Sequence, residues 1–558
     1  DIKRLFLAFS LSFIFIITWG WFVPPATAVE KALPSVEEEN IAVVESSDEG
    51  FSQKINLTYT KNQDIVNTNN LIDTDLISMN LIRGGTSISK LEVVEKNKKN
   101  TLRHKGAWSI NNENYFSEMP VKLLDSQDCN PCLLINDSKT PLDFELKNNP
   151  QRSNNTTVYT SSALNGKIIK QTIVHHDTYI VDHNFTGLDA VDSLKNVSVL
   201  WSDGILPTEK NIKDDLAVLS LFVDEDDTYN EEFLNIDSIN ENISFSNRNW
   251  AGLKTKYFMK AITSKQKVDE ITFISKGGNN LYDSDFIYSD MIFSYNNIRG
   301  PLLINSYIGP IDTKYLENED TKHLVQLFGF GWFIIGYLGK LILIALMALH
   351  EIIPNYGVIC ILFAFIIRLV TGPLTKKSFV SNQKMQKIQP KMQKIQGKFK
   401  DDKAKLNQAI IELYKTEGVN PLGGCLPILI QMPLLIALFQ VFRKTIEFRG
   451  ASFLPIWITD LSQPDVIIHF AFLENIPLIS YFFGHGIALL PIIMGVVMFM
   501  NMKMTATSMQ GSQASTMYIM NGFFILLFNT FPSGLNLYYT VYNGLNYLQQ
   551  KKLKKLQN

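Results

Sequence analysis

An apolar segment that contains an arginine constrains this chain most. Residues 356–370 read YGVICILFAFIIRLV, and Arg368 is their only charged side chain. A cation inside a membrane-spanning helix costs about 2.5–3.5 kcal/mol on insertion scales, so it usually faces a partner or a wet cavity. The simpler alternative is an arginine that snorkels to the membrane surface, but Lys376 and Lys377 mark that surface about two turns further on. The sequence therefore predicts a functional site at Arg368.

The distribution of cations predicts how the chain crosses the membrane. Residues 376–415 hold 11 lysines against three acidic residues, and Lys503 and the lysines at 551–555 also follow apolar segments. The positive-inside rule places these ends in the cytoplasm. The prediction is an α-helical bundle with both chain termini cytoplasmic. It consists of an anchor helix in residues 1–28 and five core spans at about 356–373, 422–442, 487–502, 517–531 and 535–548.

Three apolar stretches leave alternatives open. Residues 1–28 also resemble a cleavable signal peptide, because Ala26-Thr-Ala28 has the small residues of a cleavage site. A span at 328–351 would move the basic region to the outside, so we predict an amphipathic helix in the interface at the outer face of the membrane there. Residues 466–483 contain Glu474 and Pro477, and are predicted to be re-entrant or packed on the surface.

Residues 56–320 have the pattern of a soluble β domain outside the membrane, reached through an acidic linker at 29–55. Tyr179, Val181, His183 and Phe185 occupy alternate positions, which is typical of a strand. Clusters of Asn and Asp punctuate the region at short intervals, as turns do in an all-β sandwich. The whole chain is therefore predicted to be a multi-domain membrane protein.

Cys129 and Cys132 form a CxxC motif in this β domain. In an extracytoplasmic domain the motif is interpreted most simply as a local disulfide. A redox-active pair is the alternative, although no βαβ pattern surrounds the motif. A zinc site would need two further ligands, which we do not find in the sequence, so no metal is expected.

The basic region 376–417 is predicted to form a cytoplasmic helical hairpin. Met385, Ile388, Met392 and Ile395 recur at the spacing of a coiled-coil seam. Asp401 or Asp402 is placed to cap the second helix. A basic hairpin of this kind suits phosphate groups or anionic lipid headgroups. Its candidate partner-binding residues are Lys384, Lys387, Lys391, Lys394, Lys398 and Lys400.

The sequence contains no catalytic motif that we can find. It has no H-E-x-x-H, no G-x-x-x-x-G-K-[ST] and no G-x-S-x-G, so we expect neither enzyme activity nor a cofactor. The spans instead carry neutral polar residues, which serve either as interhelical hydrogen bonds or as the lining of a hydrated groove above Arg368. An anion transporter that uses Arg368 is a further alternative, but it would need an internal repeat and broken helices. The polar residues are Gln431, Gln440, Asn521, Asn529, Asn536, Tyr538, Tyr539, Tyr542 and Asn543.

Several motifs resemble those of the YidC/Oxa/Alb membrane-protein insertases. The most specific is NPLGGCLPILIQMP at 420–433, and the others in the spans are Arg368 with PLTK at 373–376, WITDLS at 457–462 and FPSGLNLYY at 531–539. In the β domain, NWAGLKTKYF at 249–258 and YIGP at 307–310 resemble the large periplasmic domain of the Gram-negative members. The resemblance extends over the whole chain.

This resemblance implies an insertase and chaperone of the bacterial inner membrane that uses no ATP. The family's hydrophilic groove is open to the cytoplasm and to lipid and closed to the periplasm. By position, Arg368, Gln431, Met432, Tyr538 and Tyr539 fall on the groove, and we add Asn536 for its polarity. The implied partners are nascent membrane proteins, the Sec translocon, the ribosome, the signal-recognition pathway and the lipid bilayer. Nucleic acid would be met only through the ribosome, and the short tail after Leu548 argues against a strong ribosome-binding extension.

Overall fold

The computed structural model divides the chain into two compact units at Phe328 and Gly329. We call them the β unit and the helical unit. The predicted anchor at 1–28 and linker at 29–55 lie outside the residues that the structure describes. Those residues are 70–96, 101–108, 115–126, 128–192, 194–226, 228–235, 238–239, 241–277, 287–298, 300–331, 333–399, 402–419, 426–469, 486–506 and 512–555.

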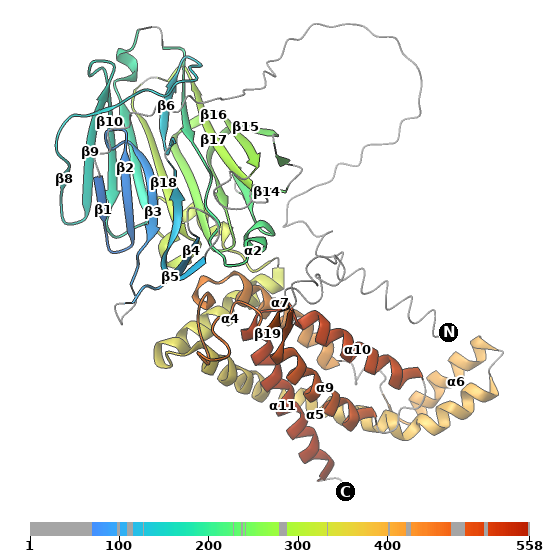
Figure 1. The fold of residues 1–558 in the computed structure, drawn as a ribbon. Coiled ribbons are helices and arrows are strands. Elements are labelled where there is room, and N and C mark those ends of the chain that lie inside the picture. Colours follow the sequence, from blue (N-terminus) through green and yellow to red (C-terminus); the bar gives the residue numbers. More distant parts are fainter. Residues whose placement is uncertain are drawn as a thin grey trace, which may run out of the picture. The chain divides into compact units, whose positions relative to one another are not determined.

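The smaller of the two main sheets in the β unit has five antiparallel strands in the order β1-β2-β3-β5-β4 (Figure 1). Ile77, Met79 and Leu81 of β2 are buried at alternate positions, as the period of two in a strand requires. The strands are β1 Asn70–Asp73, β2 Ile77–Ile82, β3 Ser87–Val93, β4 Lys105–Trp108 and β5 Tyr115–Asp125.

The larger sheet has 13 strands, and its path runs β14-β13-β15-β16-β18-β11-β10-β9-β7, with β6, β8, β12 and β17 attached beside it. The long strand β16 pairs with β18 through Phe258–Ser264 and with β17 through Glu270–Gly277, so the sheet branches there. The strands are β6 Cys132–Ile135, β7 Glu145–Leu146, β8 Gln151–Arg152, β9 Thr156–Ala163, β10 Ile168–His175, β11 Ile180–Thr186, β12 Asn196–Trp201, β13 Ser220–Glu225, β14 Thr228–Phe233, β15 Asn242–Lys254, β16 Phe258–Gly277, β17 Ile287–Asn296 and β18 Leu302–Pro310.

The β-rich class predicted for this region is confirmed. Val181, His183 and Phe185 of β11 are buried, whereas Asp182 and Asn184 between them are half-buried. The two sheets meet where the β2–β3 turn contacts β9 and β10, since Lys170 donates to the Thr86 carbonyl oxygen and Ser161 donates to that of Gly84. Short helices complete the unit: η1 Leu188–Ala190, α2 Ile212–Leu216, α3 Thr313–Leu316 and η3 Lys322–Leu327.

In the helical unit, α11 packs against α5 and α9, α10 packs against α9, and α4 packs against α7 and α5. Figure 1 shows α6 folding back beside the end of α5. The elements are α4 Phe333–Ile352, α5 Tyr356–Lys398, α6 Lys403–Thr416, α7 Leu426–Lys444, η5 Ile446–Phe448, β19 Val466–His469, β20 Gly486–Ala488, α9 Leu489–Ala506, α10 Ser512–Phe528 and α11 Ser533–Lys555.

Two segments of the described helices are long and apolar enough to cross a membrane, namely Ile334–Ile352 in α4 and Tyr356–Met385 in α5. Leu489–Met504 in α9 is apolar but shorter. The number of five core spans therefore stays a prediction. So does the interfacial position expected for 328–351, although α4 does present apolar side chains outward, among them Tyr337 and Ile344.

Two described helices extend beyond the spans predicted for them. The span at 356–373 and the first helix of the hairpin at 376–417 are one continuous helix, α5. Lys and Gln are good helix formers, so polar sequence beyond the apolar segment does not end the helix. For the same reason α11 continues past the predicted end at 548 to Lys555. In the stretch 466–483, β19 pairs with β20, and the rest lies outside the described residues.

Candidate functional site

Arg368 lies on α5 and reaches across to α11. The residue is 7% exposed. Its guanidinium donates hydrogen bonds to neutral oxygens. Nη2 donates to Asn546 Oδ1 at 2.9 Å and to Gln549 Oε1, and Nη1 donates to Thr375 Oγ1 at 3.2 Å. Within the described part of the chain, none of its partners is a carboxylate. The hydrogen bonds therefore hold the cation without neutralising its charge.

The position of Arg368 along α5 is nearer to the lysine-rich end of the helix. At 1.5 Å per residue, the residue lies about 18 Å from Tyr356 and about 12 Å from Lys376. The next two residues, Leu369 and Val370, are 78% and 73% exposed. One turn of α5 therefore joins a buried cation to an outward apolar surface.

An aromatic cluster on α11 contacts the Arg368 cation through one ring. The Tyr542 ring centroid lies 5.5 Å from the guanidinium carbon, within the range of a cation–π contact. The Tyr542 hydroxyl lies 3.1 Å from Thr371 Oγ1 on α5. Tyr538 is buried between Tyr542 and Tyr539, with ring centroids at 5.9 and 5.0 Å. Both predicted tyrosines therefore lie in one aromatic cluster with the ring that contacts Arg368.

The other predicted groove residues have different surroundings. Gln431 of α7 faces Tyr539, and Met432 beside it is half-buried. Asn536 is fully buried, and its amide donates to the carbonyl oxygens of Phe528 at 3.1 Å and Phe531 at 3.2 Å. Because these carbonyls lie at the end of α10, Asn536 holds the α10–α11 turn. A contact between this amide and a client polypeptide stays a prediction.

The partners of Arg368 were not predicted from the sequence. Asn546 and Gln549 are three residues apart on α11 and so share one face of the helix. Gln549 was overlooked because the last span was expected to end at 548, and Asn546, inside that span, was not among the polar residues singled out. A helix continued through the polar tail would have placed both amides on one face. Thr375, seven residues after Arg368, was likewise assigned to the boundary of the span.

The candidate lysines of the predicted hairpin that the structure describes lie on the second half of α5. Asp402 caps α6, because its side chain accepts a hydrogen bond from the Lys405 N–H at 3.1 Å. Tyr414 of α6 donates to Met392 Sδ of α5 at 3.4 Å, which joins the two helices. Five of the six candidate residues are exposed, and Lys400 lies outside the described residues. The exposed residues are Lys384, Lys387, Lys391, Lys394 and Lys398.

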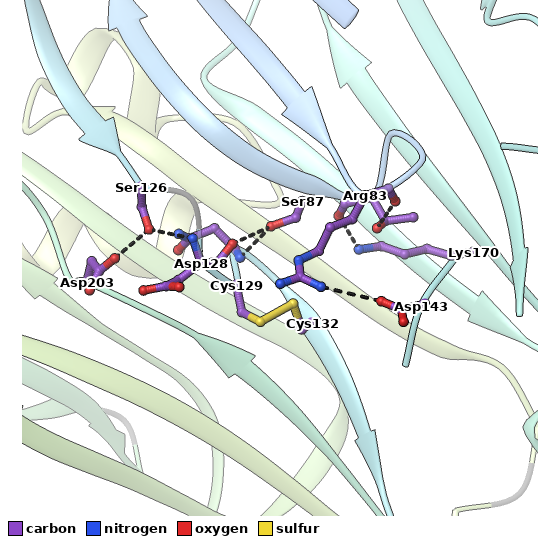
Figure 2. Close-up of a disulfide and its surroundings, with 11 residues drawn as sticks. Arg83, Ser87, Ser126, Asp128, Cys129, Cys132, Asp143, Lys170 and Asp203 are labelled. Atoms are coloured by element: carbon purple, nitrogen blue, oxygen red, sulfur yellow. Dashed lines mark hydrogen bonds and ion pairs between the residues drawn. A yellow bond between two sulfur atoms is a disulfide. The ribbon is translucent and has the colours of Figure 1, made fainter. Parts of the chain in front are cut away.

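Cys129 and Cys132 form a disulfide, and their Cα atoms are 5.0 Å apart (Figure 2). Both cysteines are buried, and the loop between them is bonded to several elements of the β unit. The Asn130 N–H donates to Ser87 Oγ at 2.7 Å, and the Ser202 N–H donates to the Cys129 carbonyl oxygen at 2.6 Å. The local disulfide interpretation of the motif therefore agrees with the structure.

Two family models match the chain. The model described as "60Kd inner membrane protein" matches residues 348–558, and the model described as "YidC periplasmic domain" matches residues 72–342. The chain belongs to the YidC family. The second match covers most of the β unit, and the first covers Arg368 and the helices around it. Membership assigns the chain to a family of inner membrane proteins that carry a periplasmic domain.

Curated relatives in this family share about a third of their residues with the chain. The "Membrane protein insertase YidC" of Chlorobium limicola is 34% identical over 385 residues, which cover 67% of this chain and 64% of the relative. That of Chloroherpeton thalassium is 33% identical over 387 residues, with 66% and 62% covered. The chain thus spans just under two thirds of the length of these relatives.

A solved structure titled "Active YidC insertase crystal structure with the first transmembrane domain resolved" aligns over 86% of this chain and 91% of that chain. The identity is 18% and the TM-score is 0.35. A likeness at that level supports no structural argument, so the family assignment rests on the sequence matches.

Proposed function

We propose that this chain is an insertase and chaperone for integral membrane proteins. It draws a polar or acidic segment of a nascent chain toward Arg368 and releases the apolar segment into lipid. The observation that carries this proposal is the buried Arg368 guanidinium, which is bonded only to neutral oxygens in the described residues. The names of the curated relatives support the same function.

The physical argument concerns a charge that is held but not neutralised. A carboxylate about 4 Å from the guanidinium would gain roughly 4 kcal/mol at an effective dielectric constant of about 20. Such an attraction is strong enough to recruit an acidic tail and weak enough to release it. The exposed apolar side chains of Leu369 and Val370 lie next to the cation and offer the client a route to lipid. No covalent step is needed, so the proposed role is not enzymatic.

The residues proposed for the client path are those predicted from the sequence, with Asn546 and Gln549 added as the groups that hold Arg368. Tyr538 and Tyr539 belong to the aromatic cluster that contacts the cation through Tyr542. Gln431 approaches this cluster from α7, and Met432 is the next residue in the sequence. Asn536 belongs to this set only indirectly, since its hydrogen bonds hold the α10–α11 turn that precedes Tyr538 and Tyr539.

The proposed topology has five core spans, cytoplasmic termini and an anchor at 1–28. The β unit is then periplasmic, and the basic helices at 376–417 are cytoplasmic. Exposed lysines there suit phosphate-rich partners such as the ribosome. The Sec translocon and the signal-recognition pathway are proposed as further partners through family membership.

Reconstitution tests the function directly. The purified full chain is placed in liposomes, and a single-span client with a short acidic tail is synthesised beside them in a system depleted of Sec components. The protease-protected fraction of the client is measured. We expect protection above that of empty liposomes, and less of it when the acids of the tail are replaced by Asn and Gln. Equal protection in empty and loaded liposomes would overturn the proposal.

A further inference from the structure

One segment of the helical unit collects the ends of five helices. We call residues 446–465 together with 486–488 the outer cap, because it lies at the helix ends opposite the lysines of α5, α9 and α11. The α5 cap Asn355 donates to the Phe453 carbonyl oxygen at 3.3 Å. At the start of α11, the Ser533 N–H donates to the Gln463 carbonyl oxygen at 2.8 Å. The cap is therefore fixed to α5 and α11 by backbone groups.

Asp465 joins the cap to α9. Its side chain is buried at 5% exposure, and Oδ2 accepts from the Leu490 N–H at 2.8 Å and from Trp457 Nε1 at 3.2 Å. The first N–H groups of a helix have no partner within the helix, and a carboxylate there is favoured by the helix dipole. Asp465 thus satisfies the start of α9 and holds the Trp457 ring with the same oxygen.

The end of α10 is tied to the cap by Asn529. Its amide donates to the Gly486 carbonyl oxygen at 2.8 Å, and its oxygen accepts from the Ala488 N–H at 2.9 Å. Since β20 leads directly into α9, the hydrogen bonds of Asn529 and those of Asp465 hold α9 and α10 at the same end. All five helices α5, α7, α9, α10 and α11 therefore meet at the cap.

Side chains of the described residues pack closely between the helix ends. A Cβ atom on Gly357 would lie 2.3 Å from the Phe453 ring, and a Cβ atom on Gly534 would lie 2.7 Å from the Phe442 ring. Phe448 and Leu461 are fully buried. Among the described residues, close packing of this kind resembles that of a protein interior, in contrast to the polar surroundings of Arg368.

We propose that Asp465 is the positioning residue of a seal that keeps the client path closed on the outer side. This inference rests on the proposed insertase function. A client drawn to Arg368 from the lysine-rich side meets the closed cap and leaves sideways into lipid. Asp465 never touches the client; it acts by holding Trp457 and the start of α9 in the closed arrangement.

Cys360 provides a reporter for the seal. It lies four residues after Tyr356 on α5, is fully buried, and carries a free thiol. Cys129 and Cys132 are disulfide-bonded, so a Cys425→Ser background leaves Cys360 as the single free thiol of the full chain. The protein is reconstituted with its outer face exposed, and a charged maleimide that does not cross the bilayer is added. The rate of Cys360 labelling then measures opening of the cap.

Substitutions at Asp465 separate the hydrogen bonds from the fold. Asp465→Ala removes a charge-assisted acceptor, so we expect labelling to rise on the order of tenfold. Asp465→Asn keeps an oxygen that can accept from Leu490 and Trp457, and labelling should stay near that of the parent. Trp457→Phe keeps most of the packing but loses the indole donor, and we expect a smaller rise of roughly threefold.

The pattern across these variants decides the proposal. A Cys360 that stays protected in both Asp465→Ala and Trp457→Phe contradicts it, and so does equal labelling of Asp465→Ala and Asp465→Asn. If Asp465→Ala does not fold, as judged by size-exclusion chromatography in detergent, the comparison of Trp457→Phe with Asp465→Asn carries the test. Client insertion is measured in the same vesicles. A failure of insertion by the parent protein overturns the proposed function, whereas unchanged labelling overturns the seal.

Discussion

The β unit and the helical unit each bury a cation, and they surround it differently. In the β unit, Lys260 Nζ donates to Asn130 Oδ1 at 2.7 Å and to the carbonyl oxygens of Ser202 and Gly204, each at 3.1 Å. The carboxylates of Asp203 and Asp290 act on the same charge. In the helical unit, the described hydrogen bonds of Arg368 go only to amide and hydroxyl oxygens.

The two sites differ in whether the charge of the cation can still attract another charged group. Nearby acids offset the field of Lys260, and its three acceptors use all the donors of an ammonium group. That lysine is a structural element of the fold. Arg368 is held by dipoles, so its net charge can still attract a carboxylate from another chain. Burial alone therefore does not distinguish a structural cation from the cation that we propose to be functional, whereas the charges of their partners do.

The largest expected effect concerns pH, because the β unit buries groups that titrate near neutrality, whereas an arginine does not titrate. Asp215 is fully buried and accepts from the Thr208 and Glu209 N–H groups at 2.6 and 3.0 Å. Burial, with the nearby Glu209 carboxylate, raises the pKa of Asp215 to about 7. The native state then binds this proton more tightly than the unfolded state does. The contribution of Asp215 to stability should therefore fall as pH rises from about 4 to 7, by a few kcal/mol at most.

The measurement is the midpoint of unfolding of the full chain by urea in detergent. Unfolding of the β unit is monitored by circular dichroism, and the midpoint is determined across this pH range. Asp215→Asn serves as the matched variant, because it keeps an acceptor oxygen and cannot ionise. Its midpoint should depend less steeply on pH. Parallel pH profiles for the two proteins would show that Asp215 is not the group responsible.

Removing the structural cation should be the next largest effect. Lys260→Met fills a similar volume but leaves three buried oxygens without their donor, so we expect a loss of about 3 kcal/mol, roughly 1 kcal/mol for each acceptor. Hydrogen exchange of peptides from β16 and β12 in the full chain measures this loss. Peptides from α5 and α11 should exchange as in the parent. A variant with unchanged exchange in β16 would contradict the structural role of Lys260.

The buried environment of Arg368 could be predicted from the sequence, since a cation within an apolar segment usually faces a partner or a wet cavity. Its partners could not, because Gln549 lies in a polar tail whose helical continuation no hydrophobic pattern marks, and no sequence pattern pairs Asn546 with Arg368. The β class followed from the alternation in β11, but the branching of the large sheet depends on long-range pairs of β16. Asp465 lies outside every helix, and only the folded chain brings it to the start of α9.

The effect of removing the functional cation should appear in activity rather than in stability. We expect Arg368→Ala to lower insertion of the acidic-tailed client about tenfold, which corresponds to roughly 1.4 kcal/mol. Arg368→Lys restores the charge, but one ammonium group cannot reproduce the fork that reaches Asn546, Gln549 and Thr375. Partial rescue is therefore expected. Insertion of a client with a neutral tail is the control, and an equal loss for both clients would show that charge is not what Arg368 supplies.

The smallest expected effect comes from a substitution that gives Arg368 a carboxylate partner, so that its site resembles that of Lys260. Asn546→Asp places a carboxylate where the amide oxygen now lies 2.9 Å from Nη2. The ion pair should leave the fold as stable as the parent or more so, because a partly buried charge gains a counter-ion. It should nevertheless lower insertion of the acidic-tailed client roughly fivefold, since the pair offsets the field that recruits the tail.

Asn546→Ala is the matched control for this last variant. It removes one acceptor but keeps the net charge of the site, so insertion should fall only about twofold, in line with an interhelical hydrogen bond of roughly 0.6 kcal/mol. The thermal midpoint and the protease-protected fraction are measured together for both variants. An Asn546→Asp protein that inserts the client as well as the parent would mean that Arg368 acts without its free charge. The distinction between the two buried cations would then fail, because a neutralised cation would serve insertion equally well.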